Sequence, residues 1–168
     1  MLGGLLRHTW EVASIARSIC RTTPADPDLV LSGALLHDIG KLEAYSWERS
    51  FEFSTRGHLY GHVVLGSLML QQRLHECPGH HCTTDEVDTL QHLILSHHGK
   101  LEFGAPVEPK TLEAELLHYA DDTSAKLDSM AQAVSSPELF QDGGLISTRP
   151  VWQLDRRRVY RGKSQWGL

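Results

Sequence analysis

The sequence predicts an all-α fold, a helical bundle of five or more core helices with a metal site in its centre. Apolar residues recur at helical spacing over most of the chain, and helix start signals precede several of these stretches. Eleven histidines occur in 168 residues, and several stand where a helical pattern favours an apolar residue. We therefore expect a single domain at 1–168, with a helical core at about 5–135 and an irregular basic C-terminal segment at about 143–168.

The composition narrows the class of protein. Hydrophobic residues make up 40% of the chain and charged residues 22%, as in ordinary globular domains. The net charge is -5 with histidine neutral, so the surface as a whole is not expected to attract nucleic acid. The chain has three cysteines, and their spacing matches no disulfide framework, which indicates a reducing cytoplasm. The N-terminus has no apolar run long enough for a signal peptide or a membrane span.

The first half of the chain predicts three helices. Apolar residues from Leu5 to about Cys20 form a helical stripe. Asp26 is a cap, with Pro27 at the first position of a second helix that runs to about residue 42. This helix is apolar nearly all round and should be central. Residues 47–55 alternate weakly and predict a short hairpin or an irregular loop, and a third helix follows at about 59–74.

The second half predicts two more helices. Thr83 and Glu86 form a capping box that opens a helix ending near residue 96. Thr111 caps a long helix that runs to about residue 134. The chain between these two helices, and the chain from Gly143 onward, is expected to form loops or short extended pieces.

Histidine and aspartate recur along the predicted helices in a fixed order. The residues are His8 in the first helix, His37 and Asp38 near the end of the second, His62 at the start of the third, His97 at the end of the fourth, and Asp121 within the fifth. Imidazole and carboxylate groups can bind a metal ion that catalyses hydrolysis, without any sulfur ligand. Bundle cofactor sites are built from one or two ligands on each core helix. Any one of these residues alone is typical of an ordinary surface or core position, but together they predict a metal centre that cleaves phosphate esters.

The segment from His37 to Lys41 is the most specific part of this set. Asp38 follows an apolar run, and burying a carboxylate there is costly unless a cation or a hydrogen-bonding partner compensates it. Gly40 is expected to end the helix by a glycine stop, so that Lys41 lies beside the carboxylate and the imidazole. Lys41 is alternatively a helix C-terminal lysine that the helix dipole favours. Asp121 precedes Asp122, and one of these two carboxylates is expected to turn inward.

Nearly the whole chain resembles the HD superfamily of metal-dependent phosphohydrolases, and within it the HD domain of YhaM-type 3′→5′ exoribonucleases. The residues of the resemblance are Gly3-Gly4-Leu5-Leu6-Arg7-His8-Thr9, Gly33-Ala34-Leu35-Leu36-His37-Asp38-Ile39-Gly40-Lys41, Gly61-His62 with Gly66, Leu93-Ile94-Leu95-Ser96-His97-His98-Gly99, Phe103-Gly104, Pro106, Pro109-Lys110-Thr111, His118-Tyr119-Ala120-Asp121, and Trp152-Gln153-Leu154-Asp155 with Tyr160. The His/Asp motif of the superfamily is moderately specific for the reaction type, and the longer matching segments are specific for the subfamily.

The resemblance implies two divalent ions and a role for each residue. His8, His37, Asp38 and Asp121 would hold one ion, and Asp38 would bridge to a second ion held by His62 and His97. Lys41 would neutralise the phosphate as charge builds in the reaction, and His98 would bind the phosphate or protonate the leaving oxygen. The roles of His97 and His98 are interchangeable at this stage. Mixed imidazole and carboxylate donors suit manganese, which we favour, as well as Fe²⁺, Co²⁺, Mg²⁺ or Ni²⁺.

The substrate expected from the resemblance is single-stranded RNA or DNA, cleaved from its 3′ end. The alternatives are a nucleotidase or phosphomonoesterase that acts on small nucleotides, and a non-catalytic module with a structural metal. The full His/Asp set argues against the non-catalytic module. The basic tail adds candidates for substrate binding, since six cations lie between positions 149 and 163, among them Arg156, Arg157 and Arg158. The cluster is either a solvated tail or a phosphate-contacting patch.

The chain departs from the exoribonuclease pattern in two ways. Such enzymes are expected to carry an oligonucleotide-binding β-barrel before the HD domain, whereas this chain begins at the HD domain itself. RNA specificity is therefore open. The second departure is the segment Cys77-Pro78-Gly79-His80-His81-Cys82, which offers zinc ligands but matches no strong zinc template, so an ordinary loop is favoured. The pair His97-His98 is also not followed by the Gly-Tyr-Pro signature of cyclic-dinucleotide phosphodiesterases.

Overall fold

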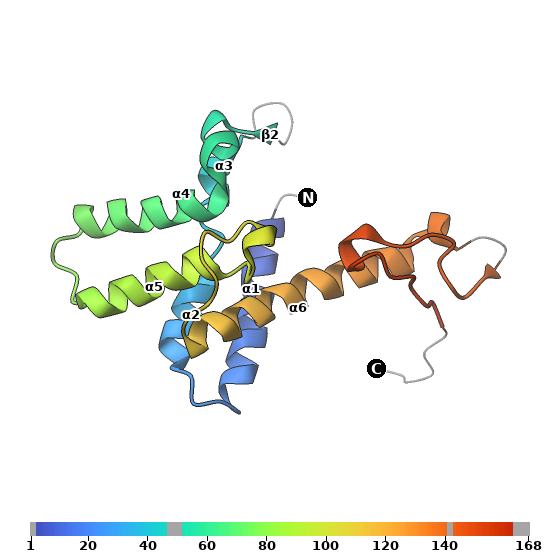
Figure 1. Cartoon of the computed structure of the whole chain (residues 1–168), viewed down its shortest axis with the longest axis horizontal. Coiled ribbons are helices and arrows are strands. Elements are labelled where there is room, and N and C mark those ends of the chain that lie inside the picture. Colours follow the sequence, from blue (N-terminus) through green and yellow to red (C-terminus); the bar gives the residue numbers. More distant parts are fainter. Residues whose placement is uncertain (1–2, 47–51, 141–142, 163–168) are drawn as a thin grey trace. The chain divides into compact units, whose positions relative to one another are not determined.

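The computed structural model describes residues 3–46, 52–140 and 143–162, and these confirm the predicted all-α class (Figure 1). The helices are α1 (Gly4–Cys20), α2 (Pro27–Leu36), α3 (Lys41–Ala44), α4 (Thr55–Glu76), α5 (Thr84–Ser96) and α6 (Leu112–Ser135). Short 3-10 turns are η1 (Leu101–Phe103), η2 (Pro137–Leu139) and η4 (Trp152–Leu154). None of the helices in the described ranges combines the length and the apolar character that a membrane span requires.

Of the short hairpin or irregular loop predicted at residues 47–55, the structure describes the strand β2 (Glu52–Phe53), which pairs with β1 (Tyr45–Ser46) just before the predicted segment. The strands are antiparallel, with Tyr45 opposite Phe53 and Ser46 opposite Glu52. Residues 47–51 of the predicted segment lie outside the described residues. The pair leads directly into α4, which begins after the Ser54 cap, whose hydroxyl accepts a hydrogen bond from the backbone N–H of Gly57.

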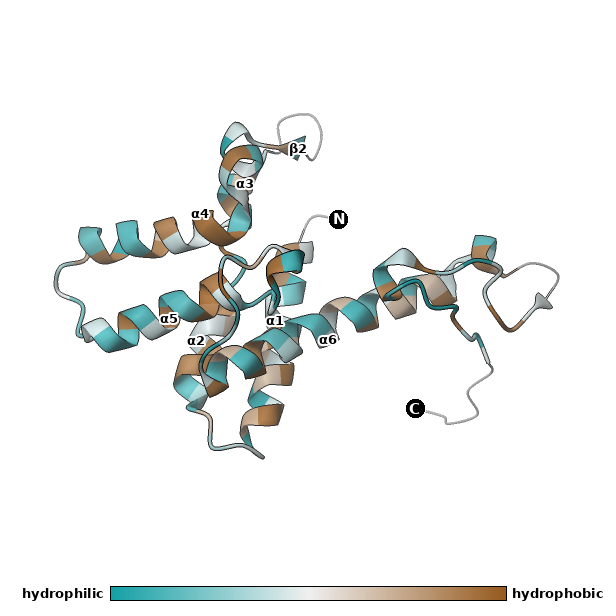
Figure 2. Ribbon diagram, in the orientation of Figure 1, coloured by the Kyte–Doolittle hydropathy of each residue, from teal (hydrophilic) through white to brown (hydrophobic). Residues whose placement is uncertain are grey.

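The chain divides into two compact units, residues 1–122 and 123–168, and the boundary falls inside α6. The first unit has its apolar core where α1, α2, α5 and α6 meet. The buried side chains of this core are Val12, Ala16, Ala25, Val30, Ala34, Leu93, Ala114, Leu116, Leu117 and Ala120. In Figure 2 the ends of α4 and α5 that flank their connecting loop are mostly hydrophilic, so this helical pair reaches beyond the core.

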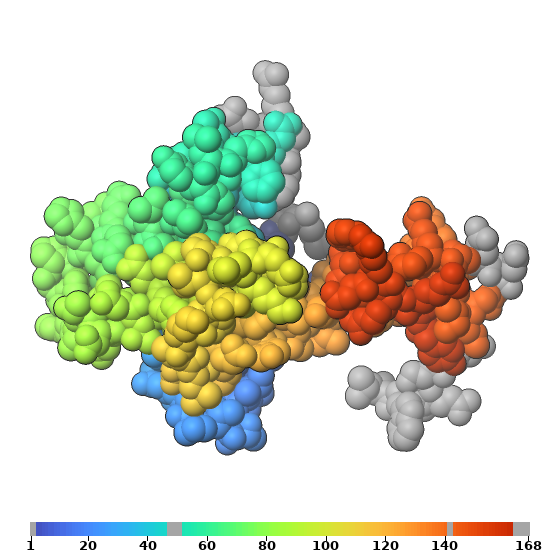
Figure 3. Space-filling model, in the orientation of Figure 1, coloured from blue at the N-terminus to red at the C-terminus, as the bar shows by residue number. Residues whose placement is uncertain are grey.

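The starts of the helices follow the sequence signals. Asp26 accepts hydrogen bonds from the backbone N–H groups of Asp28 and Leu29, with Pro27 in the first turn of α2. The Thr83–Glu86 capping box opens α5. The Thr111 hydroxyl accepts from the N–H of Ala114 at the start of α6. The loop between α5 and α6 lies on the near face of the first unit in the space-filling view (Figure 3).

The second helix differs from its prediction at its C-terminal end. α2 stops at Leu36 instead of about residue 42, and Asp38 follows in a tight turn with hydrogen bonds from the N–H of Ile39 to Leu36 and from the N–H of Lys41 to Asp38. Leu35 is 57% exposed, so α2 is buried on one side only, although its sequence is apolar nearly all round. A central position for the whole of α2 was the wrong expectation.

Gly40 does not end α2 as a left-handed glycine stop. Its φ is -62°, in the ordinary right-handed region. A glycine is nevertheless required, because a Cβ at this position would collide with the backbone oxygen of His62 and the backbone nitrogen of Gly66 on α4. The close approach of the turn to α4 therefore replaces the predicted stop as the reason for glycine.

The second unit consists of the end of α6 and the irregular segment that follows, as the sequence predicts from Gly143 onward. Isolated antiparallel bridges join Ile146 to Tyr160 and Val151 to Arg157. The unit has its own small apolar core, made by Ala133, Leu139, Phe140, Val151, Leu154 and Val159. This cluster gives the basic segment a folded framework over its described residues.

Candidate metal centre

Asp38 lies at the middle of the candidate site, with its two carboxylate oxygens directed to different neighbours. Its Oδ2 lies 3.4 Å from His37 Nε2 and 3.6 Å from His8 Nε2. Its Oδ1 lies 3.3 Å from His62 Nε2 and 3.8 Å from His97 Nε2. The carboxylate is deeply buried, since Asp38 is only 2% exposed. One residue of the α2–α3 turn thus separates two groups of imidazoles.

The first group brings together His8 from α1, His37 from the turn and Asp121 from α6. His8 Nε2 lies 2.9 Å from Asp121 Oδ1 and 3.4 Å from His37 Nε2. His37 Nε2 lies 3.8 Å from Asp121 Oδ1. The three ligand atoms are all within 4.8 Å of one another, a spacing suited to a single cation.

The second group consists of His62 from α4 with His97 and His98 at the end of α5. Their ligand atoms also lie within 4.8 Å of one another. His98 was predicted to contact substrate, with the reverse assignment left open. The geometry gathers both members of the histidine pair with His62, so His98 belongs to the same cluster of potential ligands.

Backbone carbonyls fix the rings of the three histidines that follow the helix ends. His37 Nδ1 lies 2.9 Å from the Ala34 oxygen, and His97 Nδ1 lies 2.7 Å from the Ile94 oxygen. His98 Nδ1 lies 2.7 Å from the Phe103 oxygen in η1. When each Nδ1–H donates to its carbonyl, each Nε2 keeps its lone pair for a ligand.

His118 was not among the predicted site residues, although it lies one turn before Asp121 on α6. Its Nδ1 lies 2.9 Å from the backbone oxygen of His97, so it ties α6 to the end of α5. The spacing of His118 and Asp121, three residues apart on one helix, was the signal available in the sequence.

The site has both depressed and elevated pKa values. Burial lowers the pKa of His62 to about 4 and that of His97 to about 3, so both imidazoles are neutral near pH 7. Burial opposes ionisation of Asp38, but contact with His37 and the positive charges of His37 and Lys41 outweigh it and hold the pKa of Asp38 far below its usual range. Burial also opposes protonation of His37, but Asp38 and Asp121 together overcome this effect and raise its pKa.

Three buried polar atoms at the centre have no hydrogen-bond partner among the described residues: Asp38 Oδ1, His62 Nε2 and His97 Nε2. Unpaired buried polar atoms are rare and costly in folded proteins. All three belong to side chains that ligate divalent cations, and they surround the same space. A metal ion bound there would satisfy all three, so the residues fit the group that the sequence predicts.

Lys41 begins α3, and its Nζ lies 2.5 Å from Asp38 Oδ2. The alternative of a helix C-terminal lysine does not apply to α2, because that helix has already ended. The Lys41 side chain is 31% exposed, so Lys41 is paired with the buried carboxylate and is also partly open to solvent.

The remaining candidates are the arginines of the basic C-terminal segment and the cysteines between α4 and α5. Arg156, Arg157 and Arg158 belong to the second unit, where Arg156 stacks 4.5 Å over the Trp152 ring. Their predicted contact with substrate stays a prediction. Cys77 and Cys82 are exposed free thiols, and among the described residues neither enters a group of three potential metal ligands.

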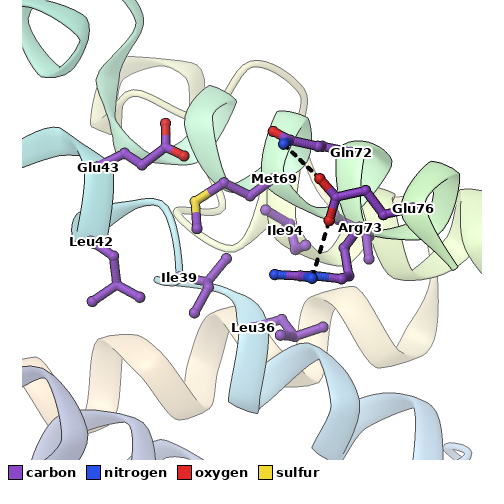
Figure 4. Close-up of a pocket in the computed structure, with 10 residues that line it drawn as sticks. Leu36, Ile39, Leu42, Glu43, Met69, Gln72, Arg73, Glu76 and Ile94 are labelled. Atoms are coloured by element: carbon purple, nitrogen blue, oxygen red, sulfur yellow. Dashed lines mark hydrogen bonds and ion pairs between the residues drawn. The ribbon is translucent and has the colours of Figure 1, made fainter.

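Pockets of similar volume lie on the first unit, and they differ in their distance from the clustered histidines. The pocket of about 440 Å³ at the start of α4 includes His62 and His98 in its lining and so adjoins the candidate centre. The pocket of about 490 Å³ in Figure 4 is lined mainly by apolar side chains such as Leu36, Ile39 and Met69. At its rim Glu76 contacts Gln72 and Arg73, and none of the clustered histidines lines it.

Comparisons with known proteins agree with this geometry. Residues 5–126 match the model of the HD domain family. The chain is 37% identical over 161 residues to the 3′-5′ exoribonuclease YhaM of Bacillus licheniformis, and 36% and 35% identical to the proteins of that name from Bacillus subtilis and Bacillus pumilus. Each match covers 95% of this chain and 49% of the relative, so the chain spans about half the length of these curated relatives. No solved structure matches at a significant level.

Proposed function

Because the chain belongs to the HD domain family, we propose that it is a metal-dependent phosphohydrolase that cleaves single-stranded RNA or DNA from the 3′ end. The observation that supports this most directly is the position of Asp38 between two sets of ligand atoms. Asp38 Oδ1 and two of these atoms, His62 Nε2 and His97 Nε2, are buried without a hydrogen-bond partner among the described residues. The 3′→5′ direction rests on the similarity to the YhaM proteins over the part of their length that this chain spans.

We propose that the centre holds two divalent ions. His8, His37, Asp38 and Asp121 would hold the first. Asp38, His62 and His97 would hold the second, and the clustering of His98 with His62 and His97 supports His98 as a further ligand rather than a substrate contact. Manganese is the favoured ion, and Fe²⁺, Co²⁺, Mg²⁺ and Ni²⁺ accept the same donors. Such a pair supplies Lewis acidity toward the phosphodiester and activates water at neutral pH.

The protein residues then have distinct tasks. The neutral imidazoles of His62 and His97 are ready to donate lone pairs near pH 7, because burial has already removed their protons. The carbonyl contacts of His37, His97 and His98 fix ring orientation. Lys41 places its ammonium group beside Asp38 on a partly exposed side chain, where it would stabilise negative charge on the phosphate.

We further propose a cytoplasmic setting, supported by Cys20, Cys77 and Cys82, which are all free thiols in the structure. In the cytoplasm, single-stranded nucleic acid is the partner that the relationship to the HD domain family favours. The arginines at 156–158 are the proposed cationic contacts for the strand outside the centre.

The test is cleavage of a 5′-labelled single-stranded RNA by the manganese-loaded protein, with the Asp38→Asn variant as the metal-site control. The expected result is a ladder of fragments that shortens from the 3′ end, with little cleavage of a blunt duplex and none by the variant. Rapid hydrolysis of nucleoside monophosphates without a ladder would replace this proposal with the nucleotidase alternative. A manganese-loaded protein inactive on both substrates would leave only the metal-binding module.

A further inference from the structure

We propose that the groove at the start of α4 binds the 3′-terminal nucleotide of a single strand, with its base stacked against Tyr60 and Phe53. The inference rests on the proposed function and assigns a substrate subsite to it. The groove has a volume of about 440 Å³, within the usual range for small-ligand sites. Its lining includes His62 and His98, so a nucleotide bound there lies next to the proposed metal ligands.

Two aromatic side chains of the groove remain open to solvent. Tyr60 is 51% exposed and Phe53 is 47% exposed. The Phe53 ring contacts the ring of Tyr45, at a centroid distance of 4.6 Å, and the ring of His58, at 5.2 Å. A ring supported in this way loses little conformational freedom when a base packs on it. Proteins hold single-stranded bases by stacking them on aromatic side chains.

The backbone of α4 is broken at the point where it borders the groove. Gly61 has φ 69° and ψ 161°, a conformation essentially restricted to glycine. In a continuous helix Tyr60 and His62, two residues apart, would face different directions. The break allows both to line the same groove. No atom of the described residues lies within 4 Å of the position that a Cβ on Gly61 would take, so backbone geometry, not packing, requires glycine here.

The chemistry of the lining suits the base and its phosphate. Among the described residues that line the groove, none carries a carboxylate that would repel a phosphodiester. The polar side chains are the imidazoles of His58, His62 and His98 and the hydroxyl of Tyr60, and the others are apolar or glycine. Such a surface holds a base by its face, so stacking occurs with little preference for base identity.

The experiment measures binding of two 5′-labelled single strands that differ only at the 3′ end, one with adenosine and one with an abasic ribose. A phosphorothioate at the last linkage keeps the charge and slows hydrolysis during the measurement. The manganese-loaded protein is expected to bind the adenosine-ended strand about tenfold more tightly, the effect of one stacked base. Tyr60→Ala should abolish this preference, and Tyr60→Phe should retain it.

Tyr119→Ala is the matched control, because Tyr119 is 56% exposed and does not line the groove. It should keep the tenfold preference. Equal affinity of the wild type for the two strands, or a full preference in Tyr60→Ala, would overturn the subsite. Absence of cleavage by the wild type on an ordinary linkage, with the binding preference intact, would reject the proposed exonuclease activity and leave the subsite standing.

Discussion

Gly40 and His62 are in such close backbone contact that no side chain fits between them, since a Cβ on Gly40 would overlap the His62 carbonyl. This contact sets the distance between the turn that holds Asp38 and the helix that holds His62. The position of His62 relative to Asp38 therefore depends on the absence of one methyl group.

Gly40→Ala is expected to separate the turn from α4 and to destabilise the protein by about 1–3 kcal/mol, as overpacking does. His62 should move away from Asp38, so one of the two ions should be lost. Urea denaturation and elemental analysis measure the two effects. Gly79→Ala is the control, since no described atom lies within 4 Å of its Cβ position. A Gly40→Ala protein with wild-type metal content would contradict this account of the contact.

The two-ion proposal predicts different metal contents for two variants. Asp38→Ala removes the carboxylate that faces both groups and should abolish activity and most bound metal. His62→Ala removes a ligand of the second group only, so about one ion per chain should remain, with activity lost. Elemental analysis of folded, manganese-saturated protein gives the counts. A full metal content in Asp38→Ala, or a single manganese in anomalous diffraction from the saturated wild type, would disprove the shared-ligand arrangement.

Lys41→Met should lower turnover by ~10²–10³ at saturating substrate, the usual effect of losing one charge-stabilising contact in the transition state. Lys41 also pairs with Asp38, so metal content must be measured alongside turnover. Lys100→Met, which replaces a lysine with a 59% exposed side chain, serves as the control. Unchanged turnover in Lys41→Met, with full metal content, would limit Lys41 to a structural ion pair.

The parts of the fold that the sequence predicted correctly are those set by local signals. Asp26 with Pro27 and the Thr83–Glu86 capping box mark helix starts through hydrogen bonds within a few residues, which the sequence displays directly. The order of histidines and aspartates was also sufficient to identify the residues that gather around Asp38. Each is on a helix end or an inward helical face, where periodicity can be read.

The features that were missed depend on contacts between distant segments. The early end of α2 and the conformation of Gly40 follow from the approach of α4, which no local pattern reveals. The break at Gly61 separates two stretches that are each helical in pattern. The grouping of His98 with His62 depends on the Phe103 carbonyl that holds its ring, and that contact forms only when the loop after α5 folds back.

His97 should make the metal-free protein sensitive to acid in a definite pH window. Burial lowers its pKa to about 3 in the folded chain, against an ordinary value of 6.5. Between these values the unfolded chain binds a proton that the folded chain does not, so the free energy of unfolding falls as pH falls. His97→Gln should remove this contribution. The wild type should therefore lose about 1.4 kcal/mol of free energy of unfolding per pH unit relative to His97→Gln, as the pH falls from about 6 to 4. Urea denaturation in chelator measures it, and parallel curves for the two proteins would contradict the assignment.

If the arginines of the second unit contact phosphates, they should determine how the affinity for a single strand depends on salt concentration. The Arg157 guanidinium donates to the Leu154 oxygen at 2.9 Å and lies 3.7 Å from Asp155, so its charge is already engaged. Arg156 rests on Trp152 and is exposed, and Arg158 is also exposed. Arg156→Ala and Arg158→Ala should each reduce the slope of log affinity against log salt by ~0.7, and Arg157→Ala should change it less.

The measurement is the affinity for a labelled single strand over a series of potassium chloride concentrations. Arg73→Ala is the control, since Arg73 is an arginine of the first unit with a 75% exposed side chain that pairs with Glu76. Its slope should equal that of the wild type. A protein that has lost a phosphate contact releases fewer counterions when it binds the strand, so the slope must fall. If Arg156→Ala and Arg158→Ala also keep the wild-type slope, the basic segment is a solvated surface.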